Sequence, residues 1–341
     1  MVMEIFWYSL LFILLGTYIL LDGYELGAGT AYIFFADSVD EKKKIIKSIR
    51  SVWDANEVWI FAFVLILYLV FPKFALTLFE YFGGYILLFL LFMLLKTLSF
   101  NLMITFPDKR MKDLFGFLYG FFSMMMIVFI GLIIANILRG IYFESDQNLQ
   151  FISEKFSPLS QHAGIFDWFT ILTSALIFIT ILIHGLGWVV LKNKGAFNKK
   201  LKKAIQRLSL ILLFVSIAFA FSWYLIHPDI YNNFFKFPLL FILPFIYISS
   251  IFGLIGIRTY QGENKGFILS TNLIITGLLS IFALMFPRLS MGLDNKKITI
   301  YNSDFFQPER FYLQWWVIAI GLFLLIYSIL IHKYNKGKIP D

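Results

Sequence analysis

The chain has 341 residues, of which 60% are hydrophobic and only 15% are charged. An average soluble domain carries about 25% charged residues, so this composition excludes a soluble globular protein and indicates a membrane protein. The formal net charge of +8 does not indicate nucleic-acid binding, because most lysines and arginines fall in short segments between apolar runs, where they set membrane topology. The lack of cysteine in the sequence excludes disulfides, thiolate nucleophiles, cysteine-ligated iron–sulfur clusters and c-type haem attachment.

Repeated apolar runs of about 20 residues or more predict an all-α polytopic membrane protein, with residues 1–341 as a single integral membrane domain. A β-barrel would alternate polar and apolar positions, and these runs do not. The first run lacks a basic n-region and a small-residue cleavage site, so we expect a membrane helix there and not a signal peptide. The nine predicted transmembrane helices cover residues 5–36, 53–80, 82–106, 114–141, 164–192, 204–227, 237–259, 266–288 and 311–333.

The distribution of basic residues predicts the orientation. Lysine and arginine are concentrated in alternate connecting segments and in the tail, at residues 37–52, 107–113, 192–207 and 333–338. The segment 142–163 is poor in them, and 289–310 is mixed. The positive-inside rule therefore predicts an N-terminus outside and a cytoplasmic C-terminus, in agreement with an odd number of helices.

Four carboxylates fall where a membrane disfavours them. Asp22 and Glu25 continue the first apolar run, and Asp54 and Glu57 begin the second. Each pair is spaced i, i+3 and shares one helix face. An ionisable group at bilayer depth costs about 2.5–3.5 kcal/mol, so it usually faces a polar interior and has a function. Because Asp22 lies roughly 25 Å below the outer end of the first helix, we expect both pairs to converge near the inner face as an intake for protons or cations.

Each acid also has a structural interpretation. Asp54 could cap the second helix and Asp22 could bond to a neighbouring helix, whereas a proton relay is the functional alternative for both and for Glu57. Glu25 is expected nearer the interface, as a solvated residue or local partner, with a relay role as its alternative. Asn56 could hold a water, orient a carboxylate or bond between helices.

The stretches LDGYELG (21–27) and WDANEVW (53–59), separated by a basic segment, resemble subunit II of cytochrome bd-type terminal oxidases. The third predicted helix departs from the family pattern, which often has an arginine-rich motif with an acid after phenylalanine. Here residues 96–103 read KTLSFNLM, so Lys96 replaces that motif only in part. Weaker matches extend over the rest of the chain, at residues 131–140, 184–185, 192–195, 286–288 and 298–302.

The resemblance implies a subunit of a quinol:oxygen oxidoreductase in a prokaryotic cell membrane, folded as two four-helix bundles plus one peripheral helix. It implies a heterodimer with a larger subunit I, which holds two b haems, one d haem and the quinol site. Oxygen is reduced to water with protons from the cytoplasm. The expected contribution of this chain is assembly and a proton-uptake route, with no metal or cofactor site and no oxidase activity alone. A structural quinone, a small single-helix accessory subunit and bound lipid stay open.

Two further residues gain an interpretation from this resemblance. It places all haem ligands in the partner, so His184 is expected to hydrogen-bond to a neighbouring group and not to ligate a haem. Arg139 ends the fourth predicted helix on the outer side, where it could snorkel, pair with a carboxylate or, as the alternative, approach a haem propionate of the partner.

Other protein classes would use the same acids differently. A secondary transporter or ion channel would bind a coupling ion there, but transporters often repeat such sites in both halves. Residues 164–288 contain no equally acidic motif, which argues against a repeat. A purely structural partner, whose acids only hold an interface together, is the third possibility.

Overall fold

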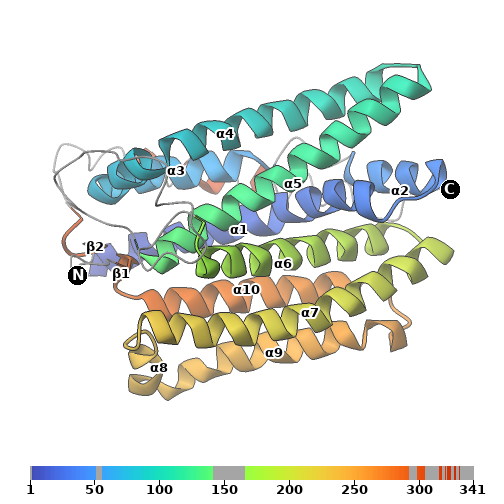
Figure 1. Ribbon diagram of the computed structural model, residues 1–341. Coiled ribbons are helices and arrows are strands. Elements are labelled where there is room, and N and C mark those ends of the chain that lie inside the picture. The colour runs from blue at the N-terminus through green and yellow to red at the C-terminus, as the bar shows by residue number, and fades with distance from the viewer. Residues whose placement is uncertain are drawn as a thin grey trace.

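The computed structural model describes residues 2–50, 56–140, 166–291 and 298–303, with short helical pieces between 315 and 330 (Figure 1). In the described part, seven helices are long and apolar enough to cross a membrane. The elements in chain order are α1 (Val2–Phe34), α2 (Val39–Ile49), α3 (Val58–Val70), α4 (Pro72–Thr105), α5 (Lys109–Arg139), α6 (Trp168–Lys192), α7 (Ala196–Ile226), α8 (Asn232–Lys236), η1 (Pro238–Phe241), α9 (Ile242–Ile255), η2 (Ile257–Thr259), α10 (Lys265–Met285), β1 (Arg288–Ser290) and β2 (Ile298–Thr299).

The helix starts follow recognisable capping chemistry. The side chains of Asp108 and Asp167 accept hydrogen bonds from backbone N–H groups in the first turns of α5 and α6. Ser38 and Glu41 form a reciprocal capping box at the start of α2. Pro72 occupies the first position of α4, where its missing N–H costs no hydrogen bond. These local signals fix where α2, α4, α5 and α6 begin.

Two of the predicted transmembrane boundaries are wrong. The chain turns at Phe71 and Pro72, not at residue 81, so α3 has only 13 residues and α4 has 34. The proline ring prevents an unbroken helix through this point, because it removes a backbone donor and crowds the preceding turn. At about 1.5 Å per residue, α3 spans roughly 20 Å, less than the hydrocarbon core of about 30 Å.

The basic connecting segments also hold more helix than expected. Residues 37–52 contain α2, and α7 begins at Ala196, so most of the basic segment 192–207 is helical. The other predicted spans between 114 and 288 each correspond to a helix of the structure, with shifted ends. The predicted helix 311–333 lies largely outside the described residues, so the count of nine stays a prediction.

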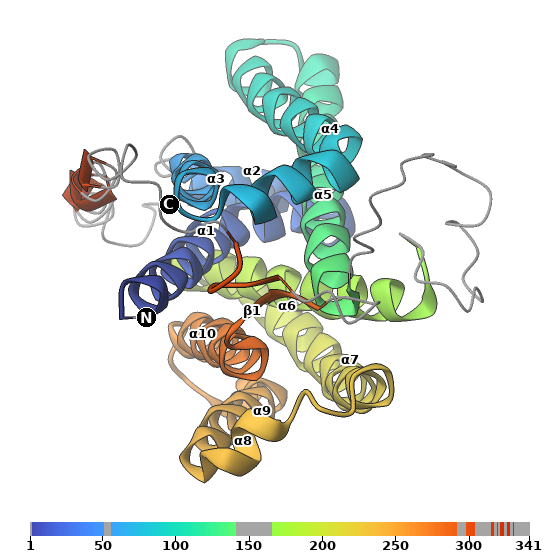
Figure 2. The ribbon, with the colours of Figure 1, turned by 90° about the vertical axis from the view of Figure 1, so that its left-hand side faces the viewer.

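Helix α1 lies at the centre of the described structure, against α3, α5, α6 and α10 (Figures 1 and 2). The contacts continue from α1 through α3 and α4 to α5, and from α6 through α7 and α9 to α10. These helices also meet one another where α1 packs against α6 and α10 and where α5 packs against α6. Both faces of α1 are therefore covered by protein over much of its length, which allows it to carry polar side chains.

Glycines bring α1 and α6 into backbone contact. A Cβ atom on Gly27 would collide with the carbonyl oxygen of Ile181 and with Gly185, and one on Gly185 would collide with the backbone of Gly27. On the other side of α1, a Cβ on Gly29 would collide with the side chain of Ser123 on α5. Small residues are the usual means of close helix contact in membranes, because packing rather than hydrophobic burial holds membrane helices together.

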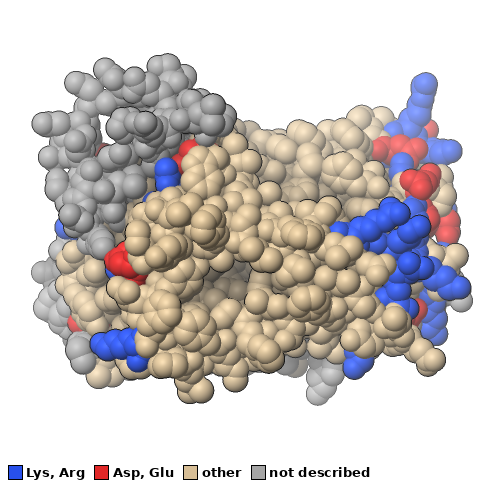
Figure 3. All heavy atoms as spheres, turned by 60° about the horizontal axis from the view of Figure 1, so that its bottom comes forward, with Lys and Arg blue, Asp and Glu red and all other residues tan. Residues whose placement is uncertain are grey.

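Charged side chains gather at one end of the molecule, the end that holds α2 and the start of α7 (Figure 3). Lys200 of α7 contacts Asp37 and Glu41 there, at 2.7 and 2.9 Å. Burial would raise the pKa of Glu41, but hydrogen bonds from Lys200 and from the backbone N–H groups of Asp37 and Ser38 outweigh it and lower this pKa below its ordinary value. This end corresponds to the side that the positive-inside rule predicts to be cytoplasmic.

Candidate functional site: a buried lysine with three carboxylates

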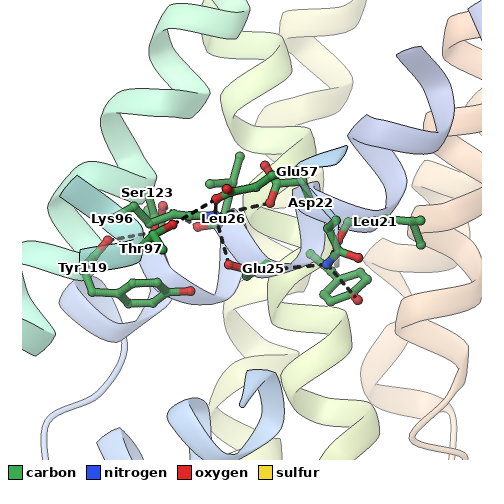
Figure 4. Close-up of polar contacts among 12 residues, drawn as sticks. Leu21, Asp22, Glu25, Leu26, Glu57, Lys96, Thr97, Tyr119 and Ser123 are labelled. Atoms are coloured by element: carbon green, nitrogen blue, oxygen red, sulfur yellow. Dashed lines mark hydrogen bonds and ion pairs between the residues drawn. The ribbon is translucent and has the colours of Figure 1, made fainter. Parts of the chain in front are cut away.

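Lys96 of α4 contacts three carboxylates inside the helix bundle (Figure 4). Its Nζ atom lies 3.0 Å from Glu25 Oε1, 2.9 Å from Glu57 Oε1 and 3.4 Å from Asp22 Oδ1. The side chains of Asp22 and Glu25 are 0% exposed, Lys96 is 1% exposed and Glu57 is 23% exposed. We call these four residues the Lys96 cluster.

Three separate elements bring the Lys96 cluster together. Asp22 and Glu25 are three residues apart on α1, so both carboxylates project from the same helix face, as the i, i+3 spacing predicted. Glu57 stands directly before the first residue of α3, and Lys96 lies in the C-terminal half of α4. The α1–α3 and α3–α4 packing contacts hold these elements beside one another.

Polar neighbours extend the Lys96 cluster on two sides. Thr97 donates a hydrogen bond from Oγ1 to Glu57 Oε1 at 3.3 Å. Asn56 donates from Nδ2 toward Glu25 Oε2 at 3.4 Å, the Leu21 carbonyl oxygen at 3.0 Å and the Tyr24 hydroxyl at 3.2 Å. Asn56, which lies two residues before α3, therefore ties that segment to α1 and contacts the Glu25 carboxylate.

The charge balance gives the Lys96 cluster its chemical capacity. Three carboxylates face one ammonium group, so full ionisation would leave two uncompensated negative charges in a largely buried site. Uncompensated buried charge costs several kcal/mol per ion. A proton on one carboxyl removes one of these charges and leaves the others paired with Lys96. The Lys96 cluster can thus take up and release a proton while its remaining carboxylates stay beside the Lys96 ammonium group.

The structure contradicts the expectation that Glu25 is solvated. Glu25 is fully buried and is a full member of the Lys96 cluster. The expectation failed because α1 extends beyond Glu25 to Phe34, and α2 and α6 pack against α1. The fourth predicted carboxylate, Asp54, lies outside the described residues.

Arg139 lies outside the Lys96 cluster and pairs with Asp167. Its Nε atom is 2.7 Å from Asp167 Oδ2, and both side chains are buried. His227 joins them through a 2.8 Å contact between its Nε2 atom and the Arg139 carbonyl oxygen. Pairing with a carboxylate is one of the interpretations of Arg139 that the sequence left open. Asp167 is not among the residues predicted from the sequence, although an aspartate three residues before Thr170 at a helix start is a capping signal.

His184 uses both ring nitrogens for hydrogen bonds within the chain. Its Nδ1 atom lies 2.9 Å from Ser270 Oγ, and its Nε2 atom lies 3.1 Å from the Leu20 carbonyl oxygen. The ring also stacks on Phe267, with centroids 4.8 Å apart. His184 therefore ties α6 and α10 to α1 close to the Lys96 cluster, as the hydrogen-bonding interpretation predicted. Throughout the described ranges, no group of three or more His, Asp or Glu side chains has the geometry of a metal site.

The fold and the Lys96 cluster define a multi-pass helical membrane protein with a charged interior. The chain matches the cytochrome bd terminal oxidase subunit II family over residues 3–334. It therefore belongs to that family, and with the seven apolar helices of its described part it is a multi-pass protein of the cytoplasmic membrane.

Two curated relatives agree with this assignment. Cytochrome bd ubiquinol oxidase subunit 2 of Bacillus subtilis (strain 168) is 23% identical over 219 residues, which cover 63% of this chain and 61% of that protein. Cytochrome bd-I ubiquinol oxidase subunit 2 of Escherichia coli (strain K12) is 23% identical over 233 residues, which cover 67% of this chain and 59% of the relative. The matched part thus spans about three fifths of each relative's length.

A solved structure shares the fold. A chain of the bd oxidase from Geobacillus thermodenitrificans superposes with a TM-score of 0.73 at 16% sequence identity, covering 98% of this chain and 100% of that one. At this identity the likeness concerns the fold alone.

Proposed function

We propose that this chain is the non-haem subunit II of a cytochrome bd-type quinol oxidase and supplies a proton-uptake route through the Lys96 cluster. In this proposal it pairs with a haem-bearing subunit I, where quinol is oxidised and oxygen is reduced to water. Membership of the subunit II family supports the proposal that this chain is part of such a complex. The observation that carries the proton route is the gathering of three carboxylates, two of them fully buried, around one buried lysine inside a membrane protein.

The route begins at the most accessible carboxylate. Glu57 is 23% exposed, whereas Asp22 and Glu25 have no exposed surface. A proton taken up at Glu57 can pass to Glu25 or Asp22, because all three contact the same ammonium group. We propose Asp54, three residues before Glu57 in the sequence, as the carboxylate that precedes Glu57 on this route.

In the proposed membrane orientation, the Lys96 cluster is nearer to the cytoplasm, from which the protons are taken. With nine spans, the N-terminus outside and the basic end in the cytoplasm, α1 runs inward. Asp22 then lies roughly 18 Å along α1 from Phe34 at the basic end and roughly 30 Å from Val2. The Lys96 cluster falls in the cytoplasmic half of the membrane, as a route for protons consumed in oxygen reduction requires.

The described histidines do not fit a haem in this chain. Both ring nitrogens of His184 have partners inside the chain, and Nε2 of His227 contacts the Arg139 carbonyl oxygen. We therefore propose that the haems belong to the partner subunit. Arg139 and His184 act in the proposal as structural residues, outside the proton route.

The test compares carboxylate variants in the intact complex. Asp22→Asn and Glu57→Gln keep the side-chain shape but cannot carry a negative charge or relay a proton. We expect quinol-driven oxygen consumption and proton uptake to fall by about a hundredfold, within the range measured for positioned acid–base groups. Asp113→Asn is the control, because this carboxylate is 45% exposed and pairs with Lys42, away from the Lys96 cluster. Normal proton uptake in Asp22→Asn and Glu57→Gln complexes that retain all their haems would leave the carboxylates with a structural role only.

A further inference from the structure

Three basic side chains of α7 form an exposed row at the basic end of the molecule. They are Lys199, Lys203 and Arg207, and their spacing of four residues places them on one helix face. None of the three forms an ion pair with a residue that the structure describes. Like charges at this spacing repel one another, so these side chains, which we call the α7 basic row, lack a counter-charge.

The neighbouring lysines of α7 have partners inside the chain. Lys200 contacts the carboxylates of Asp37 and Glu41, and Lys202 donates a hydrogen bond to the Tyr260 carbonyl oxygen at 3.0 Å. These contacts lie on the sides of α7 that face the rest of the protein, where α6, α9 and η2 pack against it. The α7 basic row lies on the remaining, exposed side. Its counter-charge must therefore come from a group outside this chain.

An exposed apolar face continues the α7 basic row toward the middle of the membrane. Between residues 208 and 222 the exposed large side chains are all apolar and share the helix face of the row: Leu210, Ile211, Phe214, Ile217 and Phe221. From Arg207 to Ile217 the helix rises roughly 15 Å, half of a hydrocarbon core of about 30 Å. Figure 3, which brings the lower side of Figure 1 forward, shows basic side chains gathered at this end and uncharged surface beside them. This face of α7 thus has the dimensions of one phospholipid, with a charged head and apolar tails.

Helix α2 offers a contrast at the same end of the molecule. Its exposed side chains Lys43, Lys47 and Arg50, which we call the α2 basic row, have a similar spacing and also form no ion pair with a described residue. The apolar residues Ile45 and Ile49 of α2 are buried against the protein, however, and α2 has only 11 residues. An anion can contact the α2 basic row, but α2 offers little surface to an acyl chain.

We propose that the α7 basic row and the apolar face beside it bind an anionic phospholipid. Its phosphate lies against Lys199, Lys203 and Arg207, and an acyl chain lies along residues 210–217. Charge complementarity selects this occupant, because anionic headgroups are attracted to basic residues next to a membrane helix, and arginine binds phosphate through two parallel hydrogen bonds. A protein segment on this face would need acidic side chains at the same depth to neutralise the row. The proposal is independent of the proton route.

The first test uses the unaltered complex. After delipidation in a neutral detergent, the complex is titrated with dioleoylphosphatidylglycerol or with dioleoylphosphatidylcholine, and native mass spectrometry counts the bound lipids. We expect phosphatidylglycerol to bind at least about tenfold more tightly than phosphatidylcholine, since each basic side chain near the headgroup contributes about fivefold. Equal affinities would overturn the proposal. Displacement of phosphatidylglycerol by inorganic phosphate at equal concentration would also overturn it, because the site would then recognise the anion and not the lipid.

The second test removes the charges of the α7 basic row. The variant Lys199→Gln, Lys203→Gln and Arg207→Gln should lower the affinity for phosphatidylglycerol by about a hundredfold, or about fivefold for each side chain, and leave phosphatidylcholine binding unchanged. The matched control carries the same three substitutions in the α2 basic row, which removes the same charge from the same end of the molecule. Because all these side chains are exposed, both variants should retain their haems and their unfolding midpoints. An equal loss of affinity in both variants would show a general effect of net charge and overturn the proposal.

The third test identifies the occupant directly. Electron cryomicroscopy of the complex in nanodiscs that contain phosphatidylglycerol should show a phosphate within about 3 Å of the side-chain nitrogens of the α7 basic row. A helix of another subunit or a second copy of this chain on this face of α7 would overturn the lipid assignment.

Discussion

Replacing Lys96 by methionine tests whether this one lysine holds the three carboxylates of the Lys96 cluster together. Methionine has a similar length and no charge, so Lys96→Met removes the ammonium group and little volume. Each Lys96–carboxylate contact, at 2.9–3.4 Å, corresponds to about 5 kcal/mol of gross Coulomb attraction at an effective dielectric constant of about 20. Desolvation opposes most of this attraction. Removing one partner of a buried ion pair costs about 3–5 kcal/mol, and we expect a loss of that size.

The assay is the thermal unfolding midpoint of the purified complex, read together with haem content and proton uptake. Lys96→Met should lower the midpoint by several degrees, and adding Glu25→Gln should recover part of the loss, because it removes one of the carboxylates left without a cation. Lys73→Met is the control, since Lys73 is an exposed lysine of the same helix. The reasoning is refuted if Lys96→Met unfolds at the same temperature as Lys73→Met, or if Glu25→Gln makes the Lys96→Met protein less stable.

Three further outcomes are expected. Gly185→Ala should destabilise the protein by about 1–3 kcal/mol, because the added methyl group collides with the backbone of Gly27; an unchanged unfolding midpoint would contradict this contact. Asp167→Asn should destabilise the protein by about 3–5 kcal/mol in the same assay, because it leaves Arg139 without its buried charged partner. A loss of stability no larger than that of Asp113→Asn would show that the pair is unimportant. The pKa of Glu41 lies below its ordinary value of 4.5, so its stabilising effect is complete above that value and is lost as pH falls through the lowered pKa. Glu41→Gln should reduce the loss of stability at acidic pH. An unchanged loss of stability at acidic pH would contradict this role of Glu41.

The sequence predicted the acids of α1 because helix geometry is local. The spacing of Asp22 and Glu25 alone places both on one face, and the cost of burying charge implies a polar environment for them. The central place of Lys96 could not be predicted in the same way. It depends on how far α4 slides along α1 and α3, which the packing of residues more than 70 positions apart decides.

The predicted boundary between α3 and α4 was wrong for a different reason. The apolar character of the chain is nearly continuous from Val58 to Thr105, so hydrophobicity alone gives no position for the turn. Pro72 supplies that position, because proline disfavours helical geometry in the preceding residue and suits the first turn of a helix. Ser38 and Glu41 likewise have the spacing of a capping box, a signal in the sequence that predicts the start of α2.

The coordination of Lys96 has a consequence for how its state can change. An ammonium group has three N–H donors, and Lys96 has three carboxylate contacts, so each donor has a partner. A fourth acceptor can bind only by displacing one of the three. A proton that neutralises one carboxylate weakens that contact and frees one donor. Protonation of a carboxylate and the number of ionised carboxylates bound to Lys96 therefore change together. A vibrational probe of the ammonium group would report the protonation state of the carboxylates directly.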